Sequence, residues 1–150
     1  MAPMQRHTPP QHGSAPAHPG DCPFCTLPEH RIRDRNDCAV VVRDAFPLTQ
    51  GHTLVIPTRH VESFFDTTAV ERGALLSLLD RAREQLQAEL RPDGYNIGIN
   101  DGRAAGQTVG HLHIHLIPRY AGDREDPRGG VRWVIPEKAA YWPDDPKDGP

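Results

Sequence analysis

The run His111-Leu-His-Ile-His-Leu-Ile117 constrains this chain most, because histidine and aliphatic side chains alternate along it. Successive side chains of a β-strand point to opposite faces of the sheet. The run therefore predicts a strand with three imidazoles on one face and aliphatic residues in a core on the other. Neighbouring imidazoles on such a face lie about 7 Å apart. Histidines on an exposed face add little to packing, so the pattern favours a chemical site over a structural surface.

Two kinds of chemistry fit such a face. Alternating strand histidines can ligate zinc or iron, whereas a neighbouring loop of backbone amides is typical of sites that bind phosphate oxygens. The loop Gly106-Gln107-Thr108-Val109-Gly110 precedes the run directly and offers both amides and a hydroxyl. The sequence holds no HExxH motif. A phosphoryl site is therefore favoured over a metal cage.

The segments around the run predict an α+β domain. Runs rich in β-branched residues predict strands over Ala39–Val42, Thr53–Ile56, Tyr95–Asn100, His111–Ile117 and Val131–Ile135. Thr68 and Glu71 match a helix capping box, and leucines then recur every three or four residues up to Leu90, just before Pro92. We expect an antiparallel sheet of about five strands with one long helix packed across it.

The ends of the chain differ in composition from its middle. Residues 1–20 contain five prolines and few apolar residues, which predicts a disordered N-terminal arm. Three histidines fall in that arm and are expected to be solvated, namely His7, His12 and His18. The folded domain is expected over residues 21–136, followed by a breaker-rich tail over residues 137–150.

Charge and hydropathy narrow the functional classes. The chain has 17 basic and 20 acidic residues and a net charge of −3, which argues against bulk binding of nucleic acid. Its 150 residues include no apolar stretch near the roughly 20 residues that span a membrane, and residues 1–20 lack an apolar signal core. We therefore expect no membrane partner and a cytoplasmic location. Three cysteines do not suggest a disulfide scaffold.

The run HLHIHLI fits the His-φ-His-φ-His-φ-φ signature of the histidine-triad (HIT) family, where φ is a hydrophobic residue. Gly51-His52-Thr-Leu-Val-Ile-Pro57, Asn100-Asp101-Gly102 and Gly106–Val109 also resemble segments of that family. The resemblance covers roughly residues 20–120. HIT proteins are typically homodimers that hydrolyse or transfer nucleoside monophosphates through a nucleotidyl-histidine intermediate. The resemblance thus implies a nucleotide-processing enzyme and a homodimer.

The resemblance also implies roles for individual residues. His113 would be the nucleophile, His115 would orient the site and handle protons near the leaving group, and His52 would support the triad. Asp44 stands where many HIT proteins hold the ribose hydroxyls with a carboxylate, although it also fits an ordinary turn. The other candidates for binding the phosphates and the base are Asn100, Gln107, Thr108, Phe24 and Phe46.

The pair Cys22-Pro-Phe-Cys25 has a spacing that suits a metal site or redox chemistry. Some HIT branches, and the related galactose-phosphate uridylyltransferases, bind structural zinc through such a pair and two histidines. The resemblance implies the ligand set Cys22, Cys25, His60 and His111, with the zinc not required for the chemistry. His30 is a rival ligand at C-x₂-C-x₄-H spacing. Cys38 is expected to pack in a strand.

The substrate class implied by the resemblance is an adenine-type nucleotide. The leading expectation is a hydrolase of dinucleoside polyphosphates or phosphoramidates. The alternatives are a nucleotidyltransferase or phosphorylase, and a regulatory module that binds nucleotides with incidental turnover. Leu116–Arg119 and Ala121–Asp123 resemble the fragile-histidine-triad branch, but Asn100 stands where that branch has glutamine. The chain thus mixes features of that branch with those of zinc-containing bacterial branches.

Overall fold

The computed structural model describes residues 19–143 of the chain. The expected disorder of the N-terminal arm, with its three solvated histidines, falls almost wholly on residues outside this range, as does the end of the expected tail. Among the described residues, no helix is long and apolar enough to cross a bilayer.

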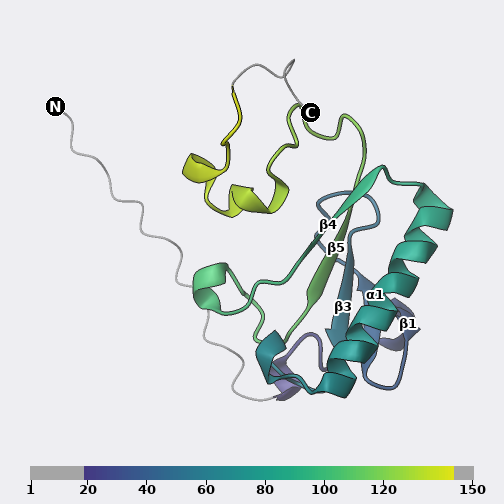
Figure 1. Ribbon diagram of the computed structural model, residues 1–150. Helices are drawn as coiled ribbons and strands as arrows, with labels where there is room; N and C mark the ends of the chain where they lie inside the picture. Colours follow the sequence, from purple (N-terminus) through teal and green to yellow (C-terminus); the bar gives the residue numbers. More distant parts are fainter. Residues whose placement is uncertain (1–18, 144–150) are drawn as a thin grey trace.

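An antiparallel five-stranded sheet carries one long helix across one face, which confirms the expected α+β class (Figure 1). The strands are β1 (Ile32–Arg35), β2 (Ala39–Arg43), β3 (Thr53–Pro57), β4 (Gly94–Gly98) and β5 (Ile114–Arg119), in the order β1-β2-β3-β5-β4. The helix α1 spans Ala69–Leu90. Within residues 19–143, six 3₁₀ turns lie between or beyond these elements: η1 (Pro19–Asp21), η2 (Glu29–Arg31), η3 (Phe64–Asp66), η4 (Arg103–Ala105), η5 (Gly130–Val134) and η6 (Pro136–Lys138).

The predicted capping box starts helix α1. The Thr68 hydroxyl accepts a hydrogen bond from the Glu71 amide at 3.1 Å, and the Glu71 carboxylate accepts one from the Thr68 amide at 2.8 Å. Arg59 donates to the same carboxylate at 2.7 Å, and this ion pair is the first cause that holds the pKa of Glu71 down to about 2. The helix ends at Leu90, where Arg91 turns into a left-handed conformation with φ 47°.

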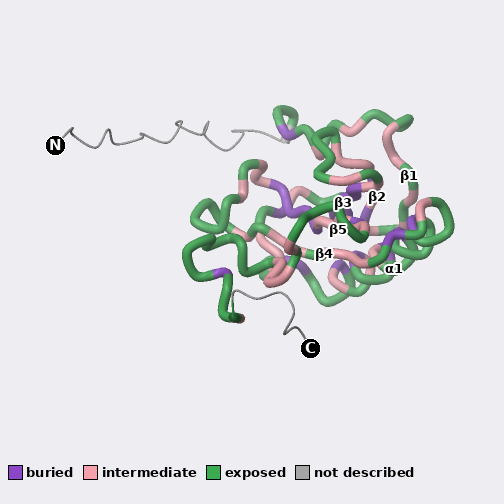
Figure 2. The backbone as a smooth tube through the Cα atoms, turned by 90° about the horizontal axis from the view of Figure 1, so that it is seen from above, coloured by how far each residue is buried: buried purple, intermediate pink, exposed green. Residues whose placement is uncertain are grey.

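The two faces of the sheet have different coverings. Helix α1 packs on one face through four fully buried side chains, Leu75, Leu78, Ala82 and Leu86. On the opposite face Val42, Leu54 and Ile56 form a smaller cluster, covered by Phe24 and Leu27 from the segment before β1. Figure 2 shows the buried residues concentrated where the sheet meets its coverings. The three histidines of the triad run, His111, His113 and His115, project from this second face.

The triad run differs from its prediction in one respect, because strand β5 begins at Ile114 and not at His111. The β3–β5 ladder stops at the pair Val55–Ile114. The Leu112 amide donates instead to the carbonyl of Val61, in the loop after β3, at 2.7 Å. The side chains nevertheless alternate as predicted, since Leu112 and Ile114 belong to the core beneath α1.

One of the five predicted strands does not form, and a different segment takes its place in the sheet. The prediction of a strand over Val131–Ile135 is wrong, because η5 occupies Gly130–Val134. Gly129 and Gly130, with φ values of 93° and 46°, turn the backbone away from an extended path just before this segment. The strand that completes the sheet is instead β1, a short edge strand that had not been predicted.

Residues 124–143, here called the C-terminal arm, carry η5 and η6. The arm lies on the side of β4 and β5 away from α1 (Figure 1). Gly130 rests on β4, since a Cβ atom built on it would lie 3.1 Å from the Asn96 side-chain nitrogen. Most of the arm is exposed, with Ala139 buried at its centre.

Gly51 in the β2–β3 connection should tolerate no side chain. Its φ is 87°, and an added Cβ would lie 2.7 Å from Leu90 Cδ1 and 2.8 Å from Leu86 Cδ2. We expect Gly51→Ala to lower the free energy of unfolding by about 2–4 kcal/mol, from backbone strain plus overpacking. Gly122→Ala is the matched control, because φ there is 82° and nothing lies within 4 Å of the added Cβ. Denaturant unfolding that gave equal losses for both variants would contradict the close approach of α1.

Candidate functional site

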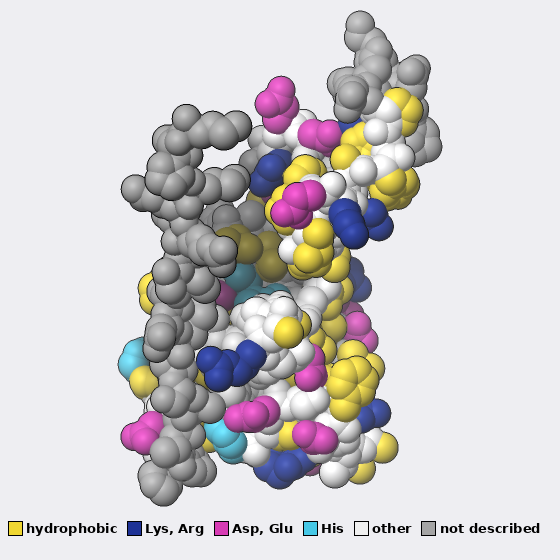
Figure 3. All heavy atoms as spheres, turned by 90° about the vertical axis from the view of Figure 1, so that its left-hand side faces the viewer, with side chains coloured by type: hydrophobic (Ala, Val, Ile, Leu, Met, Phe, Trp, Pro, Cys, Tyr) yellow, Lys and Arg dark blue, Asp and Glu magenta, His cyan; other side chains and the backbone are white. Residues whose placement is uncertain are grey.

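Two histidines of the run, His113 and His115, lie side by side on the sheet face opposite α1. Their ring centroids are 5.0 Å apart, in an edge-to-face arrangement. Figure 3 shows histidine side chains within a hollow of the surface, beside gathered hydrophobic side chains. His113 is buried and His115 is partly exposed. The third histidine, His111, is fully buried and faces the cysteine pair.

The ring orientation of His113 is fixed by a backbone carbonyl two residues earlier. Its Nδ1 lies 2.9 Å from the carbonyl oxygen of His111. A carbonyl oxygen only accepts hydrogen bonds, so Nδ1 must carry the proton. In the neutral ring, Nε2 then keeps its lone pair. That unprotonated nitrogen is what a nucleophile needs.

His52 and His115 form a hydrogen-bonded pair with a defined direction. The Leu48 amide donates to His52 Nδ1 at 3.1 Å, so the neutral His52 ring carries its proton on Nε2. That Nε2 lies 2.9 Å from His115 Nδ1 and donates to it. The proton of His115 therefore resides on Nε2. His115 thus presents a hydrogen-bond donor.

Burial keeps these histidines neutral. It is the first cause that lowers the pKa of His115 to about 4, and the neighbouring His113 and His52 add to the effect. Burial likewise lowers the pKa of His52, although the nearby Asp44 opposes the shift. At neutral pH both rings act as neutral donors and acceptors. The proton positions deduced for His52 and His115 therefore apply at that pH.

Asp44 lies directly beside this pair. One of its carboxylate oxygens accepts a hydrogen bond from the Phe46 amide at 2.9 Å, and the other lies 3.4 Å from His52 Nε2. The side chain is 15% exposed and lines a cavity. The turn expected at this position is therefore present, and the second oxygen is within reach of a bound molecule.

The residues of the expected phosphate loop are arranged unequally. Asn100 is exposed and lines the same cavity as His115. Gln107 is engaged within the protein, since its amide oxygen accepts from the Gly102 amide at 2.8 Å and its nitrogen donates to the Glu62 carbonyl at 3.0 Å. Gln107 thus holds the loop closed. Thr108 is exposed at the end of that loop.

The two candidate phenylalanines differ in setting. Phe24 is half-buried and packs edge-on against His113, with ring centroids 5.1 Å apart. Phe46 is 86% exposed and lines the cavity beside Asp44. The cavity encloses about 800 Å³, within the usual range for small-molecule sites, and its lining includes His52, His115 and residues of the C-terminal arm. His113 does not line it but lies next to His115, with the ring centroids 5.0 Å apart.

The cysteine pair meets two histidines at one end of the sheet. The ligand atoms of Cys22, Cys25, His60 and His111 all lie within 4.8 Å of one another. Cys22 Sγ lies 3.4 Å from His111 Nδ1, and Cys25 Sγ lies 3.2 Å from His60 Nδ1. A tetrahedral zinc ion with ordinary bond lengths separates its sulfur and nitrogen ligands by about 3.6 Å. The four residues therefore fit a closed Cys₂His₂ zinc site.

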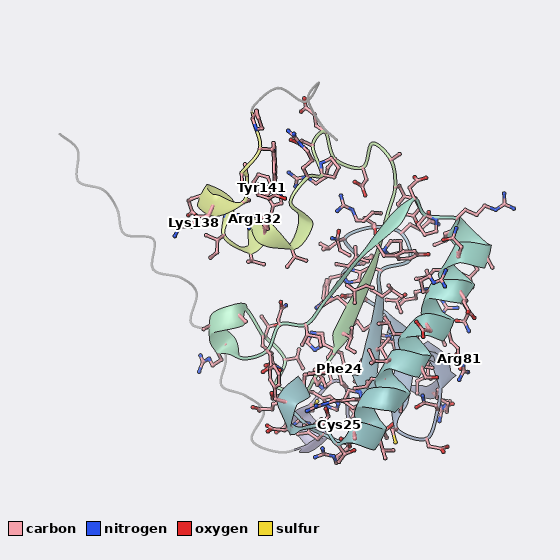
Figure 4. The ribbon with its side chains drawn as sticks, viewed as in Figure 1. Phe24, Cys25, Arg81, Arg132, Lys138 and Tyr141 are labelled. Atoms are coloured by element: carbon pink, nitrogen blue, oxygen red, sulfur yellow. The ribbon has the colours of Figure 1, made fainter. Side chains whose placement is uncertain are left out.

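The setting of His111 suits a metal ligand. Its Nε2 donates to the Pro57 carbonyl at 2.8 Å, which leaves Nδ1 unprotonated toward the two sulfur atoms. Burial lowers the pKa of His111, so its ring is neutral, as metal binding requires. Figure 4 shows Phe24 and Cys25 close together beside the sheet. The rival ligand His30 is exposed and does not belong to the cluster.

Backbone groups that define the site were not predicted from the sequence. They are the Leu48 amide and the carbonyls of Pro57 and His111, each of which sets the proton position of one imidazole. Pro57 ends the Gly51–Pro57 segment that had been noted for its resemblance, Leu48 lies three residues before that segment, and His111 begins the triad run. Both motifs were noted for their side chains and not for their backbone groups.

Comparisons with known proteins identify the relatives of this chain. A family model described as HIT domain matches residues 26–122. An uncharacterized HIT-like protein of Mycoplasma genitalium is 38% identical over 103 residues, which cover 66% of this chain and 73% of that protein. AP-4-A phosphorylase of Mycobacterium tuberculosis is 32% identical over 124 residues, which cover 81% of this chain and 63% of that protein. A Zn-bound histidine triad family protein of Mycobacterium smegmatis has a similar structure, with TM-score 0.65, 36% identity, and coverage of 73% of this chain and 82% of that one.

Proposed function

Since this chain belongs to the HIT family, we propose that it cleaves nucleotide phosphoanhydride or phosphoramidate bonds through a covalent nucleotidyl intermediate on His113. The observation that carries the proposal is the bond from His113 Nδ1 to the His111 carbonyl, which leaves Nε2 free to attack. The neutral His115 presents its Nε2 proton on the same face.

The reaction would proceed in two displacements. His113 Nε2 forms a bond to the α-phosphorus while the bond from phosphorus to the leaving group breaks, with its electron pair passing to the leaving group. A phosphate leaves an anhydride as an anion, whereas an amine leaving a phosphoramidate takes up a proton from solvent as it departs. The His115 Nε2 proton stays on the ring and donates a hydrogen bond to a phosphate oxygen, where charge develops. In the second step an acceptor attacks phosphorus, and the P–N bond breaks with its electrons returning to Nε2. When water is the acceptor, its proton passes to solvent.

Water or phosphate can complete the second step. A relative that covers 81% of this chain is named AP-4-A phosphorylase, which supports phosphate as acceptor and a dinucleoside tetraphosphate as substrate. The cavity of about 800 Å³ has room for more than a mononucleotide's phosphates. A dinucleoside polyphosphate is therefore the proposed substrate class, with hydrolysis and phosphorolysis as the two candidate outcomes.

Turnover of a substrate panel tests this proposal. The purified protein should consume P¹,P⁴-diadenosine tetraphosphate, and product analysis with and without inorganic phosphate should identify the acceptor. Formation of ADP with ATP indicates phosphorolysis, and AMP with ATP indicates hydrolysis. A regulatory nucleotide-binding module would bind these molecules without meaningful turnover. Absence of turnover across dinucleoside polyphosphates, phosphoramidates and nucleotide sugars would overturn the enzymatic proposal.

Asp44 is proposed to hold the ribose hydroxyls. Asp44→Ala should weaken ribonucleotides by about tenfold or more relative to their 2′,3′-dideoxy analogues, because charge-assisted hydrogen bonds contribute about 1.5–3 kcal/mol. Binding titrations with both sugars measure this difference. Because Asp44 also lies 3.4 Å from His52, equal losses for both sugars would assign it to positioning His52 instead.

We propose that Cys22, Cys25, His60 and His111 hold a structural zinc, since their geometry fits one and a related structure is Zn-bound. Zinc held by four protein ligands would supply stability and no chemistry. The homodimer, the adenine preference and the cytoplasmic location follow from the resemblance and the composition, and are predictions.

A further inference from the structure

The C-terminal arm has a defined structure that contains η5 and η6, although it lies beyond the residues that match the family. Arg132 donates to the carbonyls of Ala139 at 2.8 Å and Lys138 at 2.7 Å, and its guanidinium lies 4.8 Å from the centre of the Tyr141 ring. Figure 4 shows Arg132, Lys138 and Tyr141 gathered within the arm. These contacts close the arm on itself.

The arm is also held against the sheet. Arg119 of β5 donates to the Asn96 side chain at 2.7 Å and pairs with Asp123 through two hydrogen bonds of 2.6 and 2.7 Å. Asn96 is the β4 residue on which Gly130 rests. The arm thus continues directly from an anchored turn. It forms one wall of the cavity that contains His52 and His115.

Trp133 presents its ring to that cavity in a fixed orientation. Its indole N–H donates to the Arg128 carbonyl at 2.8 Å, so its polar atom is satisfied within the arm. A Cβ on Gly129 would lie 3.3 Å from the indole nitrogen, so the ring packs closely on glycine. Trp133 is nevertheless 41% exposed and lines the cavity, next to Val131 and Val134. An aromatic surface of this kind suits another planar ring.

One guanidinium beside Trp133 is available to an anion. Arg124 lines the cavity with its guanidinium 6.0 Å from the Trp133 ring centre, and within residues 19–143 its side chain makes no hydrogen bond or ion pair, although its charge helps to lower the pKa of Asp126. The acidic residues on this wall are neutralised, since Asp123 pairs with Arg119 and Asp126 with Arg128. A phosphate chain would therefore meet the positive charge of Arg124 beside an exposed aromatic ring.

We infer that the arm forms the subsite for the leaving nucleotide, with Trp133 stacking on its base and Arg124 contacting its phosphates. This inference rests on the proposed function, because it assigns the second half of a dinucleoside polyphosphate. Such a substrate carries an aromatic base at each end and negative charge between them. Two exposed aromatic residues line the cavity, Phe46 near Asp44 and Trp133 on the arm. Val131 and Val134 give the base an apolar surround.

Binding measured without chemistry tests the subsite. In a His113→Ala background, calorimetry should compare P¹,P⁴-diadenosine tetraphosphate with adenosine 5′-tetraphosphate, which lacks only the second nucleoside. Stacking of one base on an aromatic side chain contributes about 1–3 kcal/mol. Adding Trp133→Ala should therefore weaken the dinucleotide about five- to 150-fold more than the mononucleoside, and Trp133→Phe should restore most of the difference. Arg124→Gln should weaken both probes by similar factors.

Trp142→Ala is the matched control within the arm. Its ring stacks on Arg128 at 4.8 Å and does not line the cavity, so any loss from this variant should be equal for both probes. Equal losses from Trp133→Ala, no loss at all, or failure of the dinucleotide to bind would each overturn the subsite. Failure of the proposed function would appear separately, as an absence of turnover by the wild-type protein while the binding difference persists.

Discussion

Replacing His113 with alanine should lower kcat for nucleotide substrates at least about a thousandfold, or about 4 kcal/mol in activation free energy. Dissociation constants should stay within a fewfold, because the change removes the attacking nitrogen and little contact surface. Steady-state rates and calorimetric binding on the same preparations give both numbers. Near-normal turnover by this variant would remove the histidine-nucleophile mechanism.

A second variant separates chemistry from folding. His113→Asn keeps an amide N–H close to the position of Nδ1, so it can still donate to the His111 carbonyl, but it has no second ring nitrogen. It should be as inactive as His113→Ala while melting close to the wild-type temperature.

The stereochemical course at phosphorus provides an independent check. Two in-line displacements retain configuration at a chiral phosphorus, whereas direct attack by water inverts it, and inversion would contradict the covalent intermediate.

Local sequence signals predicted the central elements well. The capping box of Thr68 and Glu71 and the stop at Pro92 marked both ends of α1, because caps are formed by residues close in sequence. Two-residue periodicity identified the alternation in the triad run. The position at which β5 begins was less predictable, because the Leu112 amide donates a hydrogen bond to the carbonyl of Val61, which is distant in sequence.

The two strand errors have a common physical origin. Val131–Ile135 has the composition of a strand, but the positive φ angles of Gly129 and Gly130 and the bonds of Arg132 to the carbonyls of Lys138 and Ala139 bend it into a 3₁₀ turn. Ile32–Arg35 lacks that composition, yet it pairs with β2 as an edge strand. Propensity is overridden in both cases by tertiary contacts.

The candidate site was predicted as a set of side chains, and its proton arrangement was not. The sequence places His113 beside His115, but the nitrogen that carries each proton depends on the Leu48 amide and on carbonyl oxygens. The positions of Arg124 and Trp133 at the cavity could not be predicted either, because an arm over the cavity cannot be inferred from local periodicity. Contacts between distant backbone groups decide these features.

The protein should contain one zinc ion per chain, and its removal should lower the melting temperature by about 10–20 °C. A ligand present at a thousandfold excess over its dissociation constant stabilises the folded state by about 4 kcal/mol, and each kcal/mol shifts the melting temperature by a few degrees in a domain of this size. The ion would fix Cys22 and Cys25, which precede β1, to His60 and His111 on the sheet side. Elemental analysis and thermal melts with and without a chelator measure both effects.

Variants of individual ligands define the zinc site and its role. Cys22→Ser should lose the metal and melt like the stripped protein, whereas His30→Ala should change neither property, because His30 is exposed and lies outside the cluster. Four protein ligands leave no open coordination position, so activity should fall only as the fold is lost. At a temperature below both transitions, the stripped protein should still turn over substrate through His113.

Full stability without any metal would contradict the zinc site. Loss of zinc on His30→Ala, with zinc retained on His60→Ala, would identify His30 as the ligand in place of His60. Because His111 directs its unprotonated Nδ1 at the sulfur atoms, it would be unavailable to phosphate, which leaves the substrate to His113 and His115.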